Sequence, residues 1–153
     1  MTSTEIALLL NDDREKITRI GEIIVRKITE KDNFDNLNEF EKTFILIDVL
    51  EHNVTNGGFI QLFFNSSGQF AHEIFQAYIA IKATKTVDII SKAIQLFPTI
   101  PVPKSIRIRQ EILMESSANL DLWDSLDEEF DKYEDDILQL TINYVREHIQ
   151  YFD

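Results

Sequence analysis

The sequence predicts an all-α protein, a compact single-domain helical bundle of about seven to nine helices over residues 1–153. Through most of the chain, hydrophobic residues recur at steps of three and four, which is the period of an amphipathic helix. Only four Gly and three Pro occur in 153 residues, so long stretches are free of helix breakers. Hydrophobic residues make up 44% of the composition, enough for a core that needs no disulfide or structural metal.

The first predicted helix covers residues 5–30, where Ile and Leu recur at helical spacing. A second begins at Asn36, whose side chain can cap the helix while Glu39 stands three residues further on. The Asn-Gly-Gly at residues 56–58 is expected to stop this helix, because Gly tolerates the left-handed conformation that closes a helix.

The second half continues the helical pattern after an aromatic segment at residues 59–64 and a turn at residues 65–68. Residues 98–103 hold all three prolines and predict a stiff extended connector. The helices predicted in this half are Phe70–Ile81, a helix capped by Thr86 that ends at Phe97, a helix from Lys104 to about Ser117, and one or two helices from the capping box Ser125-Leu126-Asp127-Glu128 to about Tyr151.

The composition favours a cytoplasmic protein. The chain has no Cys, which excludes disulfides and thiolate chemistry and fits a reducing compartment. Its first residues include no basic region, and the apolar run at residues 6–10 is too short for a signal peptide or a membrane span.

The net charge of −12 is unevenly distributed along the chain. Residues 1–29 are neutral, residues 30–81 carry −6, residues 82–110 carry +5 and residues 111–153 carry −11. A field of this sign repels nucleic acid and anionic membrane and attracts basic protein surfaces. We therefore expect a basic protein as the partner, with no direct binding to nucleic acid and none to membrane.

No motif for a metal, a cofactor or a nucleophile is present. Neither a Glu-x-x-His pair nor a His-x-x-x-His pair accompanies His52, His72 or His148, and no calcium-loop pattern occurs. Gly-x-Ser-x-Gly and phosphate-binding glycine loops are also missing. We expect no enzyme activity, cofactor or metal, although two carboxylates that meet only in space leave a hydrolytic site open. A deep pocket with clustered acids would favour that alternative.

The strongest chemical feature is an acidic run from Asp121 to Asp136, which contains nine acids and a single base, Lys132. Within it Asp124, Glu128 and Asp131, continued by Asp135, are expected to form an exposed row that can imitate part of a DNA backbone. A buried stripe is expected beside the row, formed by Leu126, Phe130, Tyr133, Ile137, Leu140 and Tyr144. The candidate protein-binding residues are Asp121, Asp124, Asp127, Glu128, Glu129, Asp131, Glu134, Asp135 and Asp136, with Glu39, Glu41, Asp48 and Glu51 as additional acids.

A solvated helix face is the competing interpretation of the run. Acids in a first helical turn gain roughly 0.3–1 kcal/mol each from the macrodipole. Later acids gain nothing from it, and like charges four apart cost roughly 0.2–0.5 kcal/mol per pair. A basic stretch precedes the acidic run in the sequence and comprises Lys82, Lys85, Lys92, Lys104, Arg107 and Arg109. We expect it to offset the acidic field within the monomer or across a dimer.

The run from Glu51 to Gly68 resembles the signature of the bacterial DNA-mimic-protein family, a helical domain otherwise described as of unknown function. The pattern is Asn-Gly-Gly-Phe-x-Gln, a hydrophobic pair, Asn and then Gly, and the likeness covers about residues 37–152. The resemblance implies an all-helical domain, a homodimer, and an acidic surface that occupies the DNA-binding face of a transcription regulator. We interpret the signature itself as architectural; its residues are Asn56, Gly57, Gly58, Phe59, Gln61, Asn65 and Gly68.

The favoured hypothesis is therefore an acidic protein-binding module, a DNA mimic for a regulator or another basic protein. An immunity-type inhibitor that neutralises a toxin would use the same acidic face, and sequence does not separate the two. An enzyme with an unrecognised carboxylate site is the third hypothesis.

Overall fold

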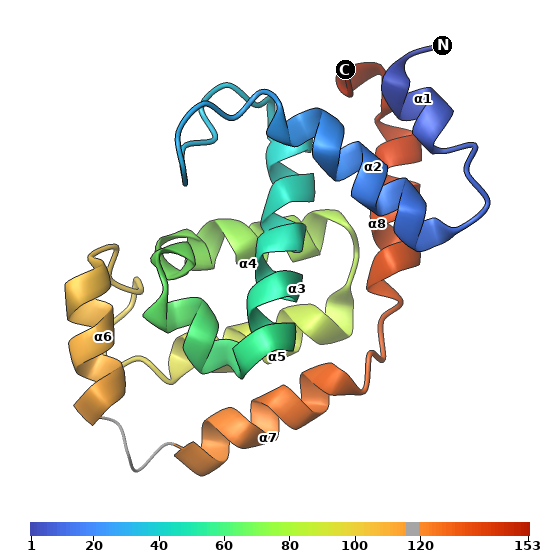
Figure 1. Ribbon diagram of the computed structural model, residues 1–153. Helices are drawn as coiled ribbons and strands as arrows, with labels where there is room; N and C mark the ends of the chain where they lie inside the picture. Colours follow the sequence, from blue (N-terminus) through green and yellow to red (C-terminus); the bar gives the residue numbers. More distant parts are fainter. Residues whose placement is uncertain (116–119) are drawn as a thin grey trace.

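The computed structural model describes residues 1–115 and 120–153, and these residues form helices without any strand. The all-α prediction is confirmed, with eight α-helices in the described residues (Figure 1). The helices are α1 (Ser3–Ala7), α2 (Asp13–Val25), α3 (Glu39–Phe64), the 3₁₀ helix η1 (Ser66–Phe70), α4 (Ala71–Ala80), α5 (Thr84–Gln95), α6 (Ile106–Glu115), α7 (Leu120–Asp131), α8 (Ile137–Glu147) and the 3₁₀ helix η3 (Ile149–Tyr151).

The prediction of one continuous helix over residues 5–30 is wrong, because two separate helices, α1 and α2, form in this region. Asp12 caps α2, and its Oδ2 accepts the Glu15 N–H at 3.1 Å. A short acidic side chain at this position satisfies a free amide at the helix start and so favours a new helix over a continued one. The second helix ends at Val25, before Glu30.

The start of α3 lies two residues later than predicted. Asn38, not Asn36, is the cap, and its Oδ1 accepts the backbone N–H groups of Phe40 and Glu41 at 3.0 and 2.9 Å. Glu41 Oε1 accepts the Asn38 N–H at 3.1 Å in return, which completes a capping box. Glu41 is also buried and paired with Lys27, so it is not one of the exposed acids that the sequence suggested.

The glycine pair bends α3 instead of ending it. Gly57 has φ −159° and ψ 18°, and Gly58 has φ 76° and ψ −177°, so helical geometry is interrupted there and resumes. The aromatic segment at residues 59–64 is the second part of the same helix. The turn predicted at residues 65–68 lies largely within η1.

Two predicted caps are also wrong. Thr86 lies inside α5, whose cap position is Ala83, and Ser125 lies inside α7. Local sequence suggested caps at both places, but packing with distant segments extends both helices towards their N-termini. Residues 98–103 are non-helical, as predicted. The helix predicted from Lys104 begins at Ile106, and its predicted end near Ser117 lies outside the described residues.

The long helix α3 runs through the middle of the molecule (Figure 1). A large apolar core surrounds it with contributions from α4, α5 and α7, and a smaller core joins α1, α2, the start of α3 and α8. The two termini meet, because the Asp153 carboxylate accepts the Ser3 N–H at 2.8 Å and the Thr4 hydroxyl. Among the described residues no helix has the length and apolar character to cross a membrane.

Candidate functional site

The acidic run is divided between α7, a turn at residues 132–136 and the cap of α8. The prediction that Asp135 continues the exposed row is therefore wrong, because Asp135 lies beyond the end of α7. Tyr133, predicted to be buried, is 46% exposed and has a left-handed φ of 46°. The stripe that α7 buries consists of Trp123, Leu126 and Phe130.

Three of the nine acids accept backbone hydrogen bonds that hold the fold together. Asp127 Oδ1 accepts the Phe59 N–H at 2.9 Å. Asp135 Oδ2 accepts both the N–H and the hydroxyl of Thr86, at 2.7 and 2.9 Å. Asp136 caps α8 by accepting an N–H in its first turn.

Two further acids form ion pairs with the basic stretch. Glu129 lies 3.5 Å from the Lys92 ammonium, and Glu134 lies 3.3 Å from that of Lys85. The basic stretch therefore offsets part of the acidic field within the monomer. All four side chains are exposed to solvent, so each pair contributes roughly 0–1 kcal/mol to stability.

The remaining four acids, Asp121, Asp124, Glu128 and Asp131, all lie on α7 and are exposed. In the part of the chain that the structure describes, none of them has a cation within 4.0 Å. Their spacing of three, four and three residues places them along one side of the helix. We call these four residues the α7 acidic row.

The signature contacts the acidic run through Gly58 and Asp127. A Cβ added at Gly58 would lie 2.2 Å from Asp127 Oδ2, so only glycine leaves room for this carboxylate. The φ of 76° with extended ψ is also a conformation that is essentially restricted to glycine. Burial raises the pKa of Asp127, the hydrogen bond from Phe59 opposes this shift, and the nearby Asp124 and Asp131 add to it.

The side-chain amides of Asn56 and Asn65 bond to polar side chains of the first part of α3. Asn56 Nδ2 lies 3.3 Å from His52 Nε2, and Asn65 Nδ2 donates to Asn53 Oδ1 at 3.1 Å. A Cβ at Gly57 would lie 2.0 Å from the Gln61 side-chain oxygen in its present rotamer.

Arg109, counted in the basic stretch that was expected to offset the acidic field, does not pair with the acidic run, because its side chain is fully buried and bound to backbone carbonyl groups. It donates to four carbonyl oxygens at 2.8–3.0 Å, those of Phe63, Asn65, Pro103 and Lys104. Gly68 allows this close packing, because a Cβ there would lie 2.6 Å from Arg109 Nε. Burial lowers the pKa of Arg109.

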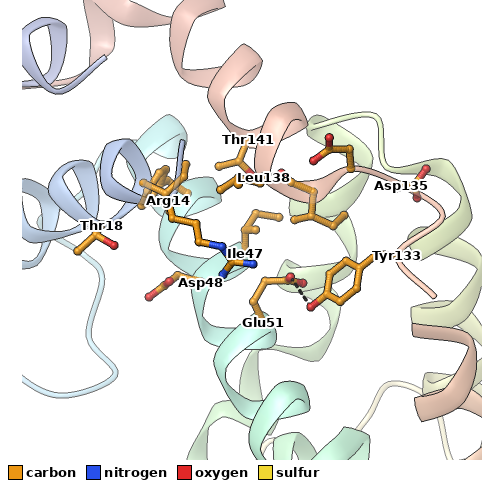
Figure 2. Close-up of a pocket in the computed structure, with 13 residues that line it drawn as sticks. Arg14, Thr18, Ile47, Asp48, Glu51, Tyr133, Asp135, Leu138 and Thr141 are labelled. Carbon is orange, nitrogen blue, oxygen red and sulfur yellow. Dashed lines mark hydrogen bonds between the residues drawn. The ribbon is translucent and has the colours of Figure 1, made fainter. Parts of the chain in front are cut away.

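A cavity of about 520 Å³ lies between α2, α3 and the chain from Tyr133 to α8 (Figure 2). Sequence reasoning did not find it, since its walls come from three distant segments. The only hints were Asp48 and Glu51, two acids three residues apart in a strongly apolar helix. Its lining residues are Arg14, Ile17, Thr18, Phe44, Ile47, Asp48, Glu51, Tyr133, Asp135, Asp136, Ile137, Leu138 and Thr141.

Glu51 is held in this cavity by two tyrosine hydroxyls. Tyr78 donates to Oε2 at 2.7 Å. Tyr133 donates to Oε1 at 3.2 Å (Figure 2). Burial raises the pKa of Glu51; the two hydrogen bonds oppose this shift and nearby Asp48 adds to it. Burial also raises the pKa of Asp48, which His52 opposes. The pKa of Tyr78 stands well above its ordinary value because of burial and the adjacent Glu51.

No group of three or more His, Cys, Asp or Glu side chains suited to a metal ion occurs among residues 1–115 and 120–153. Of the four additional acids that the sequence suggested, Glu39 is exposed at the start of α3, Glu41 is buried, and Asp48 and Glu51 line the cavity.

The fold and the acidic surface define an all-helical acidic domain in which two signature glycines, Gly58 and Gly68, lie at close contacts with side chains of other helices. A model of the DMP19-like protein family matches residues 35–148, and the chain belongs to this family. The resemblance to the DNA-mimic family is thereby confirmed. No curated protein and no solved structure gives a significant match.

Proposed function

We propose that this protein acts by binding a basic protein, as a DNA mimic that occupies the DNA-binding surface of a transcription regulator. Membership of the DMP19-like family is consistent with a mimic. The observation that carries the proposal is the α7 acidic row, four exposed carboxylates on one helix without a neutralising cation in the described chain. A partner of this kind would be met in the cytoplasm.

The spacing of the row supports imitation of a polyanion. Steps of three and four residues correspond to rises of roughly 4.5 and 6 Å on an α-helix. Phosphates of one DNA strand follow each other at about 3.4 Å along the helix axis. Four carboxylates over about 15 Å therefore present charge at a density that a phosphate-binding surface can engage.

The helix that carries the row is packed against the core, and a helix that is already folded need not be ordered on binding, which lowers the entropy cost. On the opposite side of α7, Trp123, Leu126 and Phe130 are 2, 6 and 3% exposed and pack into the core. The bond from Phe59 to Asp127 adds a polar attachment to α3. The helix can thus present its charges without rearrangement.

We further propose that the acids in the cavity do not form a hydrolytic pair. Both oxygens of Glu51 already accept hydrogen bonds from tyrosine hydroxyls. Asp135, across the cavity, is bound to Thr86. These arrangements favour a binding role for the acids over an acid–base role.

The homodimer implied by the family is the second part of the proposal. Met1, Ile6, Leu9 and Val25, on or beside α1 and α2, are each more than half exposed, and a second copy could cover such apolar side chains. Light scattering after size exclusion should give twice the chain mass of 17.9 kDa. A mass equal to one chain at high concentration would contradict the dimer.

The test of the proposed function is affinity capture from native lysate with three baits. The first is the wild-type chain, and the second neutralises the α7 acidic row by Asp→Asn and Glu→Gln. The third neutralises four exposed acids away from α7, so that both variants carry −8 instead of −12. These control acids are Glu15, Glu30, Asp35 and Glu147.

We expect a basic DNA-binding protein to be retained by the wild type and the control and lost by the α7 variant. Duplex DNA should displace it, and salt should elute it. Equal retention by all three baits would reject the site. Recovery of a single toxin in place of a regulator would point to the immunity-type inhibitor.

A further inference from the structure

The cavity between α2, α3 and α8 has no part in the proposed function. Its volume of about 520 Å³ is within the range of roughly 300–1,000 Å³ that is typical of small-ligand pockets. Part of its wall is apolar, formed by the buried residues Phe44, Ile47 and Ile137. It is separate from the α7 acidic row, none of whose members lines it.

We propose that this cavity binds an organic cation, a guanidinium or primary ammonium group carried on an apolar stem. This inference does not rest on the proposed function, since binding to the cavity can be measured without the basic partner.

The charge of the lining supports a cationic ligand. The lining contains four carboxylates, those of Asp48, Glu51, Asp135 and Asp136, and a single cation, Arg14. Asp135 and Asp136 are already engaged by backbone amides, whereas Asp48 makes no side-chain ion pair within 4.0 Å in the described chain. A cation entering a partly enclosed space gains more from such charges than it would in open water.

Arg14 indicates which cation fits. Its side chain extends from α2 into the cavity (Figure 2), yet it makes none of the ion pairs found in the described chain. Arg14 lies in the first turn of α2, where the helix dipole disfavours a positive charge. The acids of the cavity offset that cost. A guanidinium of the chain thus lies where a ligand's guanidinium would lie, and this exposed side chain can move aside.

Tyr133 supplies an aromatic ring at the same site. Its side chain points towards Glu51 and is fixed by the hydrogen bond to that carboxylate (Figure 2). A guanidinium or ammonium over a tyrosine face gains a cation–π attraction. The apolar wall can cover the stem of the ligand, so charge and shape favour the same chemical class.

The experiment is an NMR titration of the ¹⁵N-labelled full chain with n-butylguanidinium chloride, and with n-butylurea as a neutral control of nearly the same shape. We expect saturable shifts at the cavity amides and affinity for the cation roughly tenfold higher than for the urea. Equal binding of the two probes, or no binding of either, would overturn the proposal.

Two variants with opposite expected effects test the site. The double variant Asp48→Asn with Glu51→Gln should weaken binding of butylguanidinium roughly tenfold, because two charges are removed. Arg14→Gln should strengthen binding several-fold, because a competing cation is removed. Glu128→Gln, on the α7 acidic row, should leave binding unchanged.

Arg14→Gln alters an exposed side chain and keeps the test valid if the double variant does not fold. Weaker binding of butylguanidinium in Arg14→Gln would contradict the proposal, because Arg14 would then support the site and would not compete with the probe for its acids. The peptide Ac-Ala-Ala-Arg-Ala-Ala-NH₂ distinguishes the two sources of the cation. Its binding to the cavity would indicate an arginine presented by a protein, and binding of butylguanidinium alone would indicate a free small molecule.

Discussion

The α7 acidic row and the acids of the cavity differ in their surroundings. Asp124 and Glu128 project from a helix into water, with an apolar stripe behind them. Asp48 and Glu51 line the cavity, where Asp48 is still exposed and Glu51 is half-buried, and partial burial raises the pKa of both. Charges in open water can attract a large basic surface from a distance, whereas acids lining a cavity interact at short range with a small cation. The two proposals above therefore differ because of where the acids lie in the fold, and not because of residue type.

The largest effect is expected from Gly58→Ala, which disrupts the contact between α3 and α7. The substitution places a Cβ 2.2 Å from the Asp127 carboxylate at a backbone conformation that is essentially restricted to glycine. We expect a loss of about 3 kcal/mol in the free energy of unfolding, measured with urea. Gly21→Ala is the matched control, because a Cβ there meets only Phe44 at 3.6 Å. A loss in the control as large as in Gly58→Ala would contradict this account.

A smaller effect on stability is expected from Asp127→Ala. Compared with Asp124→Ala, this variant tests whether the hydrogen-bonded acid of α7 contributes more to stability than an exposed one. It leaves the Phe59 N–H without its acceptor, and we expect a loss of about 1.5 kcal/mol. Asp124→Ala, three residues earlier, should change stability by less than about 0.5 kcal/mol. Equal losses of stability in the two variants, measured by thermal or urea unfolding, would mean that the hydrogen bond to Phe59 gives Asp127 no special structural role.

The smallest effect is expected in the pH dependence of stability, which tests the role of Glu51 in the cavity. Because the pKa of Glu51 is higher in the folded chain, the folded state binds more protons than the unfolded state as pH falls through that value. The contribution of Glu51 to stability should therefore increase on acidification from neutral pH. Glu51→Gln should reduce this increase in urea unfolding, whereas Glu128→Gln should not. An unchanged slope in Glu51→Gln would show that Tyr78 and Tyr133 fully compensate for burial.

The sequence predicted the fold class and the approximate helices, because hydrophobic spacing is a local property of the chain. It failed at Thr86 and Ser125, where local cap signals compete with long-range contacts. Thr86 is bound by Asp135, which lies 49 residues away. Sequence patterns hold no information about such a partner.

The same limit applies to the candidate site. The run contained the four residues of the α7 acidic row but did not reveal which of its nine acids were already bound. Asp127 is separated from Phe59 by 68 residues, so its structural role is visible only in the folded chain. The cavity could not be predicted for the same reason, as Arg14, Glu51 and Tyr133 belong to segments far apart in sequence.

The most direct test of the α7 acidic row is the salt dependence of its affinity for the captured basic protein. The wild type, the α7 variant and the control variant of equal charge are compared by calorimetry across a range of salt concentrations. We expect the α7 variant to lose about two orders of magnitude in affinity and to show a shallower salt dependence, with the control within about threefold of the wild type. Equal losses in both variants would show that net charge, and not the row on α7, attracts the partner.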